Sequence, residues 1–409
     1  MTMTDFVDLQ AWKGRLSSSK QGYKKTITNL MMCLRGIREL GPQMKFNDLS
    51  GNIEWMGREI KDSDYVDIRM ILERNDYEPN AKDVPACVLR AAEDSAYNPV
   101  ADYLSNLVWD GKHRIERWLP VVFEADDTEI NRAFGKMFLI AAVARALNPG
   151  CQVDTMLIIE GDQGIRKSTA MAELFGADFV NGSIQKFTGS DVGLAMQGVW
   201  AVDLGELSAF KGTAVQTIKN FITLRTDSYR PPWGRHFIKR PRRIVFVGST
   251  NEDSYLNDAT GARRFWPFHA RKVHIDRLRD NRDQLWAEAV HCFKAGEQWW
   301  IDKGSHLDQL AQHVQSERYK EDVWAQAIDI FLNLSETKIR GCVTANEILT
   351  HLAIAADRKN ADTEARVTDH LRVRGWVKNR CMRHGMNLNW WFPPGTEINP
   401  RMGRPRNAS

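Results

Sequence analysis

One stretch of this chain constrains its fold more than any other: an apolar run, a glycine-rich turn and a Lys-Ser-Thr triplet follow one another within residues 151–170. Residues 156–159 have the length and apolar character of a short buried strand. Glycines at 161 and 164 let the backbone turn tightly enough for its N–H groups to converge. A helix expected over residues 169–174 adds the positive end of its dipole. This succession predicts a phosphate-binding loop, or P-loop, in an α/β fold.

The spacing fits the pattern G-x-x-x-x-G-K-[ST] with one departure, because Arg166 stands where the second glycine is expected. Lys167 is expected to reach the β- and γ-phosphates of ATP, and the Ser168 hydroxyl to bind Mg²⁺. The Arg166 side chain either crowds the loop or adds a positive charge beside the phosphates. A chance turn between a strand and a helix is the alternative. The expected nucleotide-binding residues are Gly161, Asp162, Gln163, Gly164, Ile165, Arg166, Lys167, Ser168 and Thr169.

Two further apolar segments, residues 198–204 and 243–250, are separated by helical stretches and predict a parallel sheet with helices on its faces. We expect the first segment to lie directly beside the P-loop strand, with Asp203 at its tip and Glu206 shortly after it. ATP hydrolysis needs one carboxylate for the Mg²⁺ shell and one that orients the attacking water. We assign Asp203 to the metal and Glu206 to the water. The reverse assignment, or a solvated loop acid in place of one of them, is the alternative.

Polar and cationic residues follow the second of these segments. Asn251 comes directly after it, where an amide can hydrogen-bond the γ-phosphate or the attacking water; an ordinary turn residue is the alternative. Arg263 and Arg264 follow a turn at Gly261. An arginine presented across a subunit boundary stabilises charge on the transferring phosphoryl group, whereas a surface pair is the alternative. The candidate catalytic residues are Lys167, Asp203, Glu206, Asn251, Arg263 and Arg264, and the candidate metal ligands are Ser168 and Asp203.

Positive charge gathers in two segments, although the net charge is only +4. Residues 225–243 hold seven Lys or Arg and one acidic residue around an expected hairpin. Residues 371–409 hold eight Lys or Arg and one acidic residue. Such clusters suit a nucleic-acid backbone, and a solvated loop is the alternative for the first. The expected DNA-binding residues are Arg235, His236, Lys239, Arg240, Arg372, Arg374, Lys378 and Arg380.

Most of the fourteen tryptophans are expected to pack in cores, Trp200 and Trp286 among them. Trp233, inside the basic hairpin, and Trp390 or Trp391, near the C-terminus, are the ones that we expect to be able to contact bases.

A chain of 409 residues is long enough for two or three domains. We expect a mainly helical region (1–97), a P-loop ATPase core (98–275), a helical connector (276–320), a winged-helix-like DNA-binding domain (321–395) and a flexible basic tail (396–409). The winged helix is inferred from three helical segments followed by an alternating, hairpin-like segment. The second of these helices opens with a capping-box sequence at Thr344, and the third, near residues 363–374, is expected to enter the major groove.

Other local patterns predict elements outside the P-loop region. Helices are expected over residues 26–40, closed by Gly41-Pro42, and over residues 62–73 and 134–147, with a hairpin over residues 46–55. The acidic N-terminal residues lack the apolar segment of a signal peptide, and no apolar run approaches the ~18–20 residues needed to span a bilayer. The scattered cysteines, without C-x-x-C pairs, indicate no metal site and no disulfide framework. We therefore expect a cytoplasmic protein with no membrane partner.

Taken in this order, the motifs resemble those of the virulence-associated protein E family, which is related to the superfamily-three helicases of phages, plasmids and mobile elements. The resemblance runs from about residue 98 to 268, through NPVADYLSNLVWDGKHRIERWL, IIEGDQGIRKST, GVWAVDLGEL, KNFITLRTDSYRPPWGR and RRIVFVGSTN…GARRFWPF. It implies an AAA+-like ATPase that uses ATP and Mg²⁺, assembles as a ring, with a hexamer expected, and moves on single-stranded DNA. It also implies the Walker A pair Lys167 and Ser168, a Walker B segment holding Asp203 and Glu206, the sensor Asn251, and Arg263 or Arg264 as the finger.

Three functions are compatible with these patterns. The first is a DNA-dependent ATPase that acts as a replicative helicase of a prophage or similar element, on single-stranded or forked DNA and with possible replication partners. The second is a nucleotide-switched DNA-binding protein, an initiator or regulator that does not unwind DNA, which Arg166 favours. The third is a small-molecule P-loop kinase, which would not need Asn251, the arginine pair or the basic segments.

Overall fold

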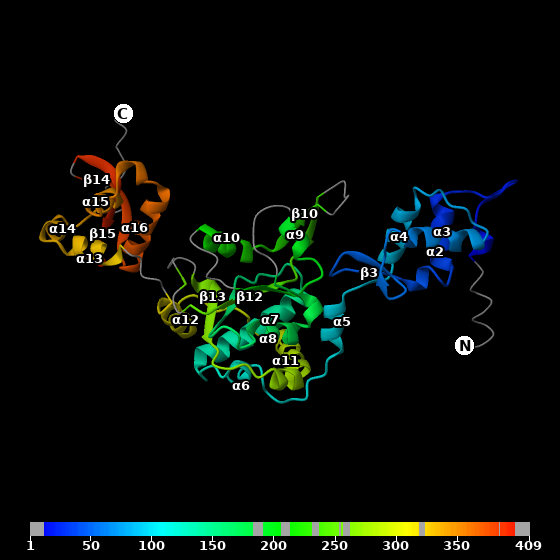
Figure 1. Cartoon of the computed structure of the whole chain (residues 1–409), viewed down its shortest axis with the longest axis horizontal. Coiled ribbons are helices and arrows are strands. Elements are labelled where there is room, and N and C mark those ends of the chain that lie inside the picture. The colour runs from blue at the N-terminus through cyan, green and yellow to red at the C-terminus, as the bar shows by residue number, and fades with distance from the viewer. Residues whose placement is uncertain are drawn as a thin grey trace.

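The central element of the protein is a parallel sheet. The computed structural model describes residues 12–182, 191–205, 213–230, 237–252, 255–256, 262–318, 324–383 and 385–396. Within these residues the sheet has five strands in the order β13–β7–β12–β9–β8, all parallel (Figure 1). The strands are β7 (Met156–Glu160), β8 (Val180–Asn181), β9 (Ala201–Leu204), β12 (Val245–Thr250) and β13 (Phe265–His269). The prediction of a parallel α/β sheet is therefore confirmed.

The order of the strands corrects one prediction. β9 does not lie beside β7, because β12 lies between them: Val247 is paired with Leu157 on one side and with Asp203 on the other. Apolar character shows that a strand is buried on both faces, but it does not show which strands are neighbours. The carboxyl ends of β7, β12 and β9 nevertheless meet at one edge of the sheet.

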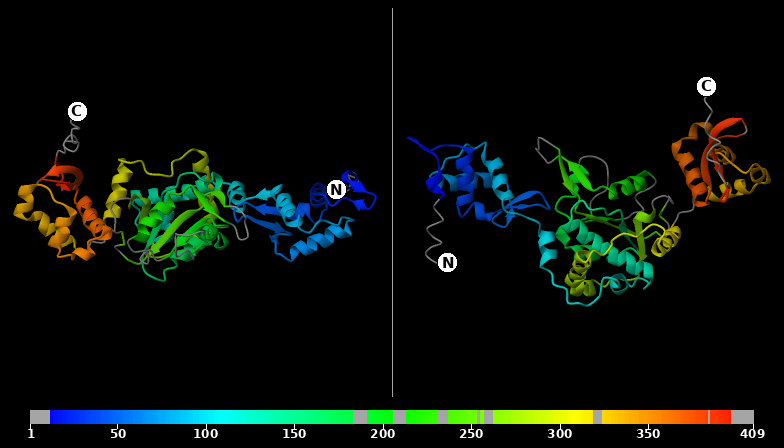
Figure 2. Two further views of the ribbon diagram at one scale, coloured as in Figure 1. Left: turned by 90° about the horizontal axis from the view of Figure 1, so that it is seen from above. Right: turned by 180° about the vertical axis from the view of Figure 1, so that it is seen from behind.

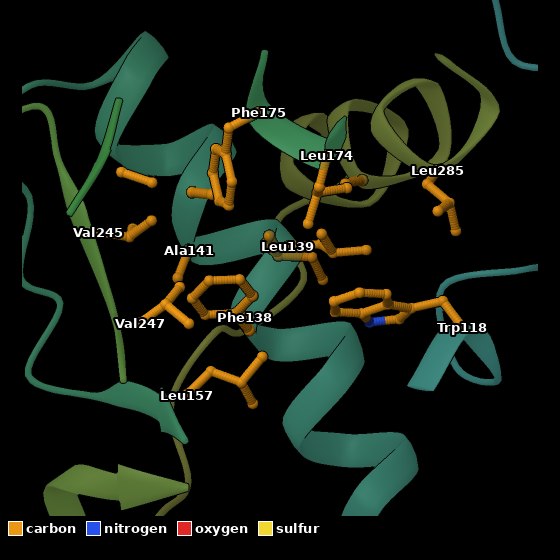
Figure 3. Close-up of a cluster of buried hydrophobic side chains, with 14 of the residues drawn as sticks. Trp118, Phe138, Leu139, Ala141, Leu157, Leu174, Phe175, Val245, Val247 and Leu285 are labelled. Carbon is orange, nitrogen blue, oxygen red and sulfur yellow. The ribbon is translucent and has the colours of Figure 1, made fainter. Parts of the chain in front are cut away.

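Helices cover both faces of this sheet. Successive side chains of a strand point to opposite sides, so these apolar strands present an apolar face on each side of the sheet. Leu157 and Ile159 lie in one apolar core with α7 (Glu129–Leu147), α8 (Lys167–Phe175) and α11 (Ile275–Lys294). Figure 3 shows part of this core, in which the rings of Phe138 and Phe175 pack edge to face with their centres 6.1 Å apart. Met156 and Ile158 face the opposite side and share a second core with α9 (Asp191–Ala195) and α10 (Thr213–Ile222).

The chain around the sheet belongs to the same core. α5 (Pro99–Asn106) and α6 (Trp118–Phe123) precede α7, and α12 (His306–Ser316) follows α11. Leu285 and Trp286 of α11 are buried in the first core, and the Trp286 indole donates to the Leu174 carbonyl at 2.8 Å. The helical connector expected over residues 276–320 thus packs into the same core as the sheet.

The region before residue 98 combines helices with two small sheets, the pair β1–β2 and the four-stranded sheet β5–β4–β3–β6. The helices are η1 (Lys13–Arg15), α2 (Ile27–Gly36), η2 (Gly41–Gln43), α3 (Asp64–Arg74) and α4 (Val84–Glu93), and the strands are β1 (Ser18–Ser19), β2 (Gly22–Tyr23), β3 (Met44–Asn47), β4 (Asn52–Trp55), β5 (Arg58–Glu59) and β6 (Ala96–Tyr97). The predicted hairpin is confirmed as the antiparallel pair β3–β4. The first helix ends earlier than predicted, because Ile37 already has extended backbone angles and Gly41 opens η2.

The C-terminal part is a separate body (Figure 2). Its elements are α13 (Ala325–Asn333), α14 (Ser335–Arg340), α15 (Ala345–His351), η6 (Ala356–Arg358), α16 (Ala361–Val373), β14 (Val377–Arg383) and β15 (Met386–Phe392). The capping box at Thr344 and the closing hairpin are confirmed, and α14 is one α-helix more than predicted. Trp390 and Trp391 are buried at 1% and 2% exposure, so the prediction that they contact bases is wrong.

Two chemical features accompany this fold. The six cysteines are buried and unpaired. In the part of the chain that the structure describes, every helix is too short or too polar to cross a membrane.

Candidate active site

A cavity of about 420 Å³ opens at the carboxyl edge of the sheet. One wall consists of Gln163, Gly164 and residues 166–169, most of them in the glycine loop, which we define as residues 161–168. The other walls are Gly205, which follows β9, and residues 249–251 at the end of β12. The cavity therefore brings together three of the segments that the sequence singled out, even though they come from three different strands.

Two glycines give the loop its shape. Gly161 has φ +137° and Gly164 has φ +88°, conformations that side chains rarely adopt. A Cβ on Gly161 would also collide with the Ala270 carbonyl oxygen, whereas a Cβ on Gly164 would meet nothing within 4 Å. The Gly161 N–H donates to the Thr250 carbonyl at 3.2 Å and ties the loop to β12. Gly161 is thus required by both its conformation and its surroundings.

Arg166 lies at the start of α8 in the left-handed conformation, with φ +72°. A glycine at this position of the pattern would accept that angle without strain, whereas an arginine does so at a cost. Its side chain is exposed and lines the cavity. Of the two interpretations of Arg166, the geometry favours an added positive charge over crowding of the loop.

The Lys167 ammonium is held inside the loop by backbone carbonyl groups. Its Nζ donates to Gly161 O, to Asp162 O at 3.2 Å and to Thr250 O at 3.2 Å. Burial lowers the pKa of Lys167, and the nearby Asp162 carboxylate opposes this effect. Lys167 thus bridges the loop and the end of β12.

Asp203 is buried at 5% exposure beneath the loop. Burial raises its pKa, while a hydrogen bond from Ser168 works in the opposite direction. Its Oδ1 atom is buried and has no hydrogen-bond partner among the residues that the structure describes. A buried carboxylate oxygen left without a donor fits a cation, and hard cations such as Mg²⁺ take oxygen ligands. Ser168 and Asp203 therefore fit the predicted metal site.

The described residues supply few other groups to that metal site. Across the described ranges, no group of three His, Cys, Asp or Glu side chains gathers as a metal cage. This agrees with the usual binding of Mg²⁺, which keeps several waters and substrate oxygens and needs only one or two protein carboxylates. Glu206, predicted to orient water, lies outside the described residues, whereas Asn251 is exposed at the cavity.

Arg263 and Arg264 lie at the opposite edge of the sheet. They belong to η5 (Ala262–Arg264), directly before β13, and Phe265 is paired with Met156, the first residue of β7. The glycine loop follows the last residue of β7, so the length of this strand, about 15 Å, separates the loop from the two arginines. The two arginines line another cavity, of about 430 Å³, together with Trp299 and Trp300. They do not reach the glycine loop of their own chain.

The basic hairpin is present as β10 (Thr226–Tyr229) paired with β11 (Ile238–Pro241). Arg235, His236 and Trp233 lie outside the described residues. Lys239 is exposed, whereas Arg240 turns toward the N-terminal region, where its Nη1 donates to Asp48 O at 3.2 Å and its guanidinium lies 5.8 Å from the Phe46 ring centre.

The basic residues of the C-terminal part differ in the same way. Arg372 forms an ion pair with Asp369 at 2.6 Å, and Arg374 pairs with Asp329. Lys378 and Arg380 are exposed on β14. All four of these cations are exposed, but Arg372 and Arg374 are already engaged with a carboxylate.

One cluster next to the cavity was not predicted. Glu160, the last residue of β7, binds Arg318 and Tyr255 through its carboxylate. The signal available in the sequence was an acidic residue at the end of an otherwise apolar strand; its partners, 158 and 95 residues away, could not be read from it.

Comparison with known proteins places this site in a family. Residues 104–320, more than half of the chain, match the virulence-associated protein E-like domain. The chain belongs to the virulence-associated protein E-like family. The match covers the glycine loop, Asp203, Asn251 and the arginine pair, as the motif resemblance had indicated.

Comparisons at the level of whole proteins add little to the family assignment. No curated protein matches this chain. Structures of the apo form of the NrS-1 C-terminal region are similar at 12% and 13% identity, with TM-scores of 0.46 and 0.43, and the similarity covers 86% of this chain and 96% of theirs.

Proposed function

We propose that this member of the virulence-associated protein E-like family is an ATP-dependent DNA helicase or translocase, which acts in the DNA replication of a prophage or mobile element. The observation that carries the proposal is the single cavity in which the glycine loop, the end of β9 and Asn251 meet. A P-loop, a carboxylate on a nearby strand and a polar sensor are the parts that hydrolysis of a nucleoside triphosphate requires. Such a role places the protein in the cytoplasm.

In this proposal the loop binds ATP through its backbone N–H groups and the dipole of α8. Lys167 exchanges its carbonyl partners for the β- and γ-phosphate oxygens, because an anionic oxygen is a stronger acceptor than a carbonyl. Ser168 and Asp203 would hold Mg²⁺, which when bound neutralises charge on the phosphates. The exposed Arg166 adds positive charge at the cavity.

The attacking water needs an acceptor and an orienting group. Glu206, three residues beyond Asp203, is the candidate acceptor, and the Asn251 amide is the candidate for contact with the γ-phosphate or the water. Asn251 directly follows Thr250, whose carbonyl accepts from Lys167 and from the Gly161 N–H. The sensor and the loop therefore share a backbone anchor, so that a change at one displaces the other.

The position of Arg263 and Arg264 supports an oligomer. They lie at the edge of the sheet opposite the loop, so either one can act on a phosphoryl group only in a neighbouring protomer. We therefore propose a homo-oligomeric ring, with a hexamer as the expected size, in which each site is completed by its neighbour. Other replication proteins are candidate partners.

DNA contacts are proposed for two surfaces. The first is the β10–β11 hairpin, with Lys239 exposed on β11; Arg235 and His236, which lie outside the described residues, are proposed to contribute to the same surface. The second is the C-terminal part, proposed as a winged helix in which α16 enters the major groove and β14, with Lys378 and Arg380, is part of the wing.

Unwinding of a forked DNA substrate tests the proposal. Wild-type protein with Mg²⁺ and ATP should separate the strands, and Lys167→Ala should not, because the ammonium that binds the phosphates is gone. A wild-type protein that hydrolyses ATP on DNA without separating the strands is a translocase. A wild-type protein that neither hydrolyses nor unwinds contradicts the proposal.

A nucleotide-switched DNA-binding protein is the second candidate, and Arg166 is the observation that favours it. An arginine with a left-handed backbone stands in place of the glycine and alters the loop that must hold the triphosphate for hydrolysis. In that case ATP binding alone would tighten DNA binding, and the forked substrate would stay paired.

A further inference from the structure

A buried carboxylate joins three segments next to the glycine loop. Glu160 is the last residue of β7 and directly precedes Gly161, and its side chain is 8% exposed. It accepts hydrogen bonds from Arg318 Nε at 2.8 Å, from Arg318 Nη2 at 2.9 Å and from the Tyr255 hydroxyl at 2.8 Å. We call these three residues the Glu160 cluster.

Each member of the cluster comes from a different functional segment. Glu160 precedes the loop that is proposed to hold the triphosphate. Tyr255 lies in the segment that follows the sensor candidate Asn251. Arg318 follows the end of α12, on the stretch of chain that leads to the C-terminal part, whose first helix begins at Ala325.

Backbone contacts reinforce the side-chain contacts. The Arg318 carbonyl accepts from the N–H groups of Tyr255, at 3.2 Å, and Leu256, at 3.1 Å. The Glu160 carbonyl accepts from the Ala270 N–H at 2.8 Å, and the Ala270 carbonyl closes off the space beside Gly161. A displacement of the loop therefore reaches Arg318 through a short series of direct contacts.

The chemistry makes the link stiff. A two-point guanidinium–carboxylate pair is directional, and removing one partner of a buried pair leaves an uncompensated charge, so the pair resists separation. Burial raises the pKa of Tyr255 well above its ordinary value, so its hydroxyl stays a donor to Glu160. Arg318 also donates to the Val314 carbonyl at 2.6 Å, which fixes it to the end of α12.

We infer that Arg318 is a positioning residue that transmits the state of the nucleotide site to the C-terminal domain, and that its bond to Glu160 is the connection. The inference rests on the proposed function, because it assumes that the glycine loop binds ATP and that DNA binds the C-terminal part. Its consequence is thermodynamic coupling: nucleotide and DNA each change the affinity for the other, by the same factor.

The test compares affinities in the full-length protein. Binding of fluorescent oligothymidylate is measured with and without a non-hydrolysable ATP analogue, and binding of the analogue with and without DNA. The variants are Arg318→Lys, which keeps the charge but loses the two-point pair, Glu160→Gln, and the double variant. Arg279→Lys is the matched control, because Arg279 pairs at two points with Glu173, at 3.1 and 3.0 Å, without touching the cluster.

The wild type and Arg279→Lys should show a coupling of at least about fivefold in both directions. Arg318→Lys and Glu160→Gln should bring it close to one, with the affinity for the analogue in the absence of DNA almost unchanged. The double variant should lose no more than either single variant, because both remove the same bond. A purely structural pair would instead lower the melting temperature and leave the coupling ratio intact.

The outcomes separate this inference from the proposed function. Full coupling in Arg318→Lys overturns the inference and leaves the proposed function standing; this variant decides the matter if Glu160→Gln does not fold. A wild type that binds both ligands without coupling also overturns the inference. A wild type that binds no nucleotide overturns the proposed function and the inference with it.

Discussion

At the scale of single residues, the candidate site contains two residues, Asp203 and Arg166, whose local environment or conformation destabilises the folded protein. Asp203 is 5% exposed, and one of its oxygens has no hydrogen-bond partner among the described residues. Arg166 has a left-handed backbone that a glycine would adopt without strain. Unfavourable local structure of this kind is common at functional sites, where it serves binding or catalysis.

Replacing Asp203 by Asn should therefore stabilise the apo protein and abolish Mg²⁺-dependent turnover. An amide of the same shape can still accept from Ser168 and has no charge to bury, so we expect a gain of about 1 kcal/mol at neutral pH. Thermal melting of both proteins in EDTA measures the gain, and Asp64→Asn is not expected to reproduce it, because the buried Asp64 carboxylate is paired with the Arg58 guanidinium and accepts from the Lys61 N–H. A variant less stable than the wild type would contradict this explanation.

The pH dependence of that gain follows from the direction of the pKa shift. The pKa of Asp203 is raised in the folded state, so protonation stabilises the fold, and this stabilisation is lost as pH rises through the raised pKa. Below the ordinary value of 3.8 the carboxyl is protonated in both folded and unfolded chains. The stability difference between Asp203→Asn and the wild type should thus be small in acid and grow toward neutral pH. A difference that shrinks with rising pH would be inconsistent with a buried carboxylate.

Arg166 allows backbone strain and charge to be separated. Arg166→Gly should stabilise the fold by about 0.5–1 kcal/mol, because relief of the left-handed conformation outweighs the extra freedom of glycine in the unfolded chain. Arg166→Ala removes the same charge but keeps a Cβ, so it should bring no such gain. Both variants should bind ATP more weakly if the arginine adds charge beside the phosphates. Equal melting temperatures for the Gly and Ala variants would rule out the strain.

At the scale of elements, the basic hairpin has two faces with different roles. Lys239 and Arg240 are adjacent on β11, and side chains alternate along a strand. Lys239 is exposed, while Arg240 contacts Asp48 and Phe46 and the neighbouring Arg243 forms an ion pair with Asp48. The root of the hairpin is anchored as well, because the buried Arg242, which directly follows β11, pairs with Asp227 of β10.

Alanine at these two adjacent positions should therefore have different effects. Lys239→Ala should weaken binding of single-stranded DNA and reduce the slope of its salt dependence by about one, because one phosphate contact is lost. Arg240→Ala should mainly lower the melting temperature, since it removes one of the contacts that hold the hairpin against the N-terminal region. Fluorescence anisotropy over a range of salt concentrations, together with thermal melting, distinguishes them. Identical effects of the two substitutions would contradict the assignment of the faces.

At the scale of the whole molecule, the chain forms an N-terminal body, an α/β core and a C-terminal body in sequence order (Figure 1). The core presents the glycine loop at one edge of its sheet and Arg263 and Arg264 at the other. A molecule with these two groups at opposite edges can complete its site only with another copy of itself, which is the physical basis for the proposed ring.

Mixing two inactive variants tests this arrangement. Lys167→Ala lacks a working loop and keeps the arginines, whereas the double variant Arg263→Ala/Arg264→Ala keeps the loop and lacks them. Mixed before assembly in equal amounts, they should regain activity at about a quarter of their interfaces, where an intact loop meets an intact arginine pair. No recovery in mixed oligomers of confirmed composition would mean that the arginines do not act on a neighbour.

Sequence patterns were informative where they depend on local physics. The apolar run at 156–159, the positive-φ glycines at 161 and 164 and the cap at Thr344 all depend on a few consecutive residues, and the structure places each as expected. Pairings between distant segments were not accessible. The insertion of β12 between β7 and β9, the contact of Arg240 with Asp48 across 192 residues, and the Glu160–Arg318 pair all depend on tertiary packing.

ATP turnover with and without single-stranded DNA tests the central claim most directly, with Lys167→Ala as the reference. The wild type should hydrolyse ATP in Mg²⁺ and do so faster when DNA is added, and Lys167→Ala should lose about a hundredfold or more of that rate, because its ammonium no longer stabilises the phosphates. A wild type that shows no turnover under either condition, or a Lys167→Ala variant as fast as the wild type, would contradict the assignment of the glycine loop as an ATP site.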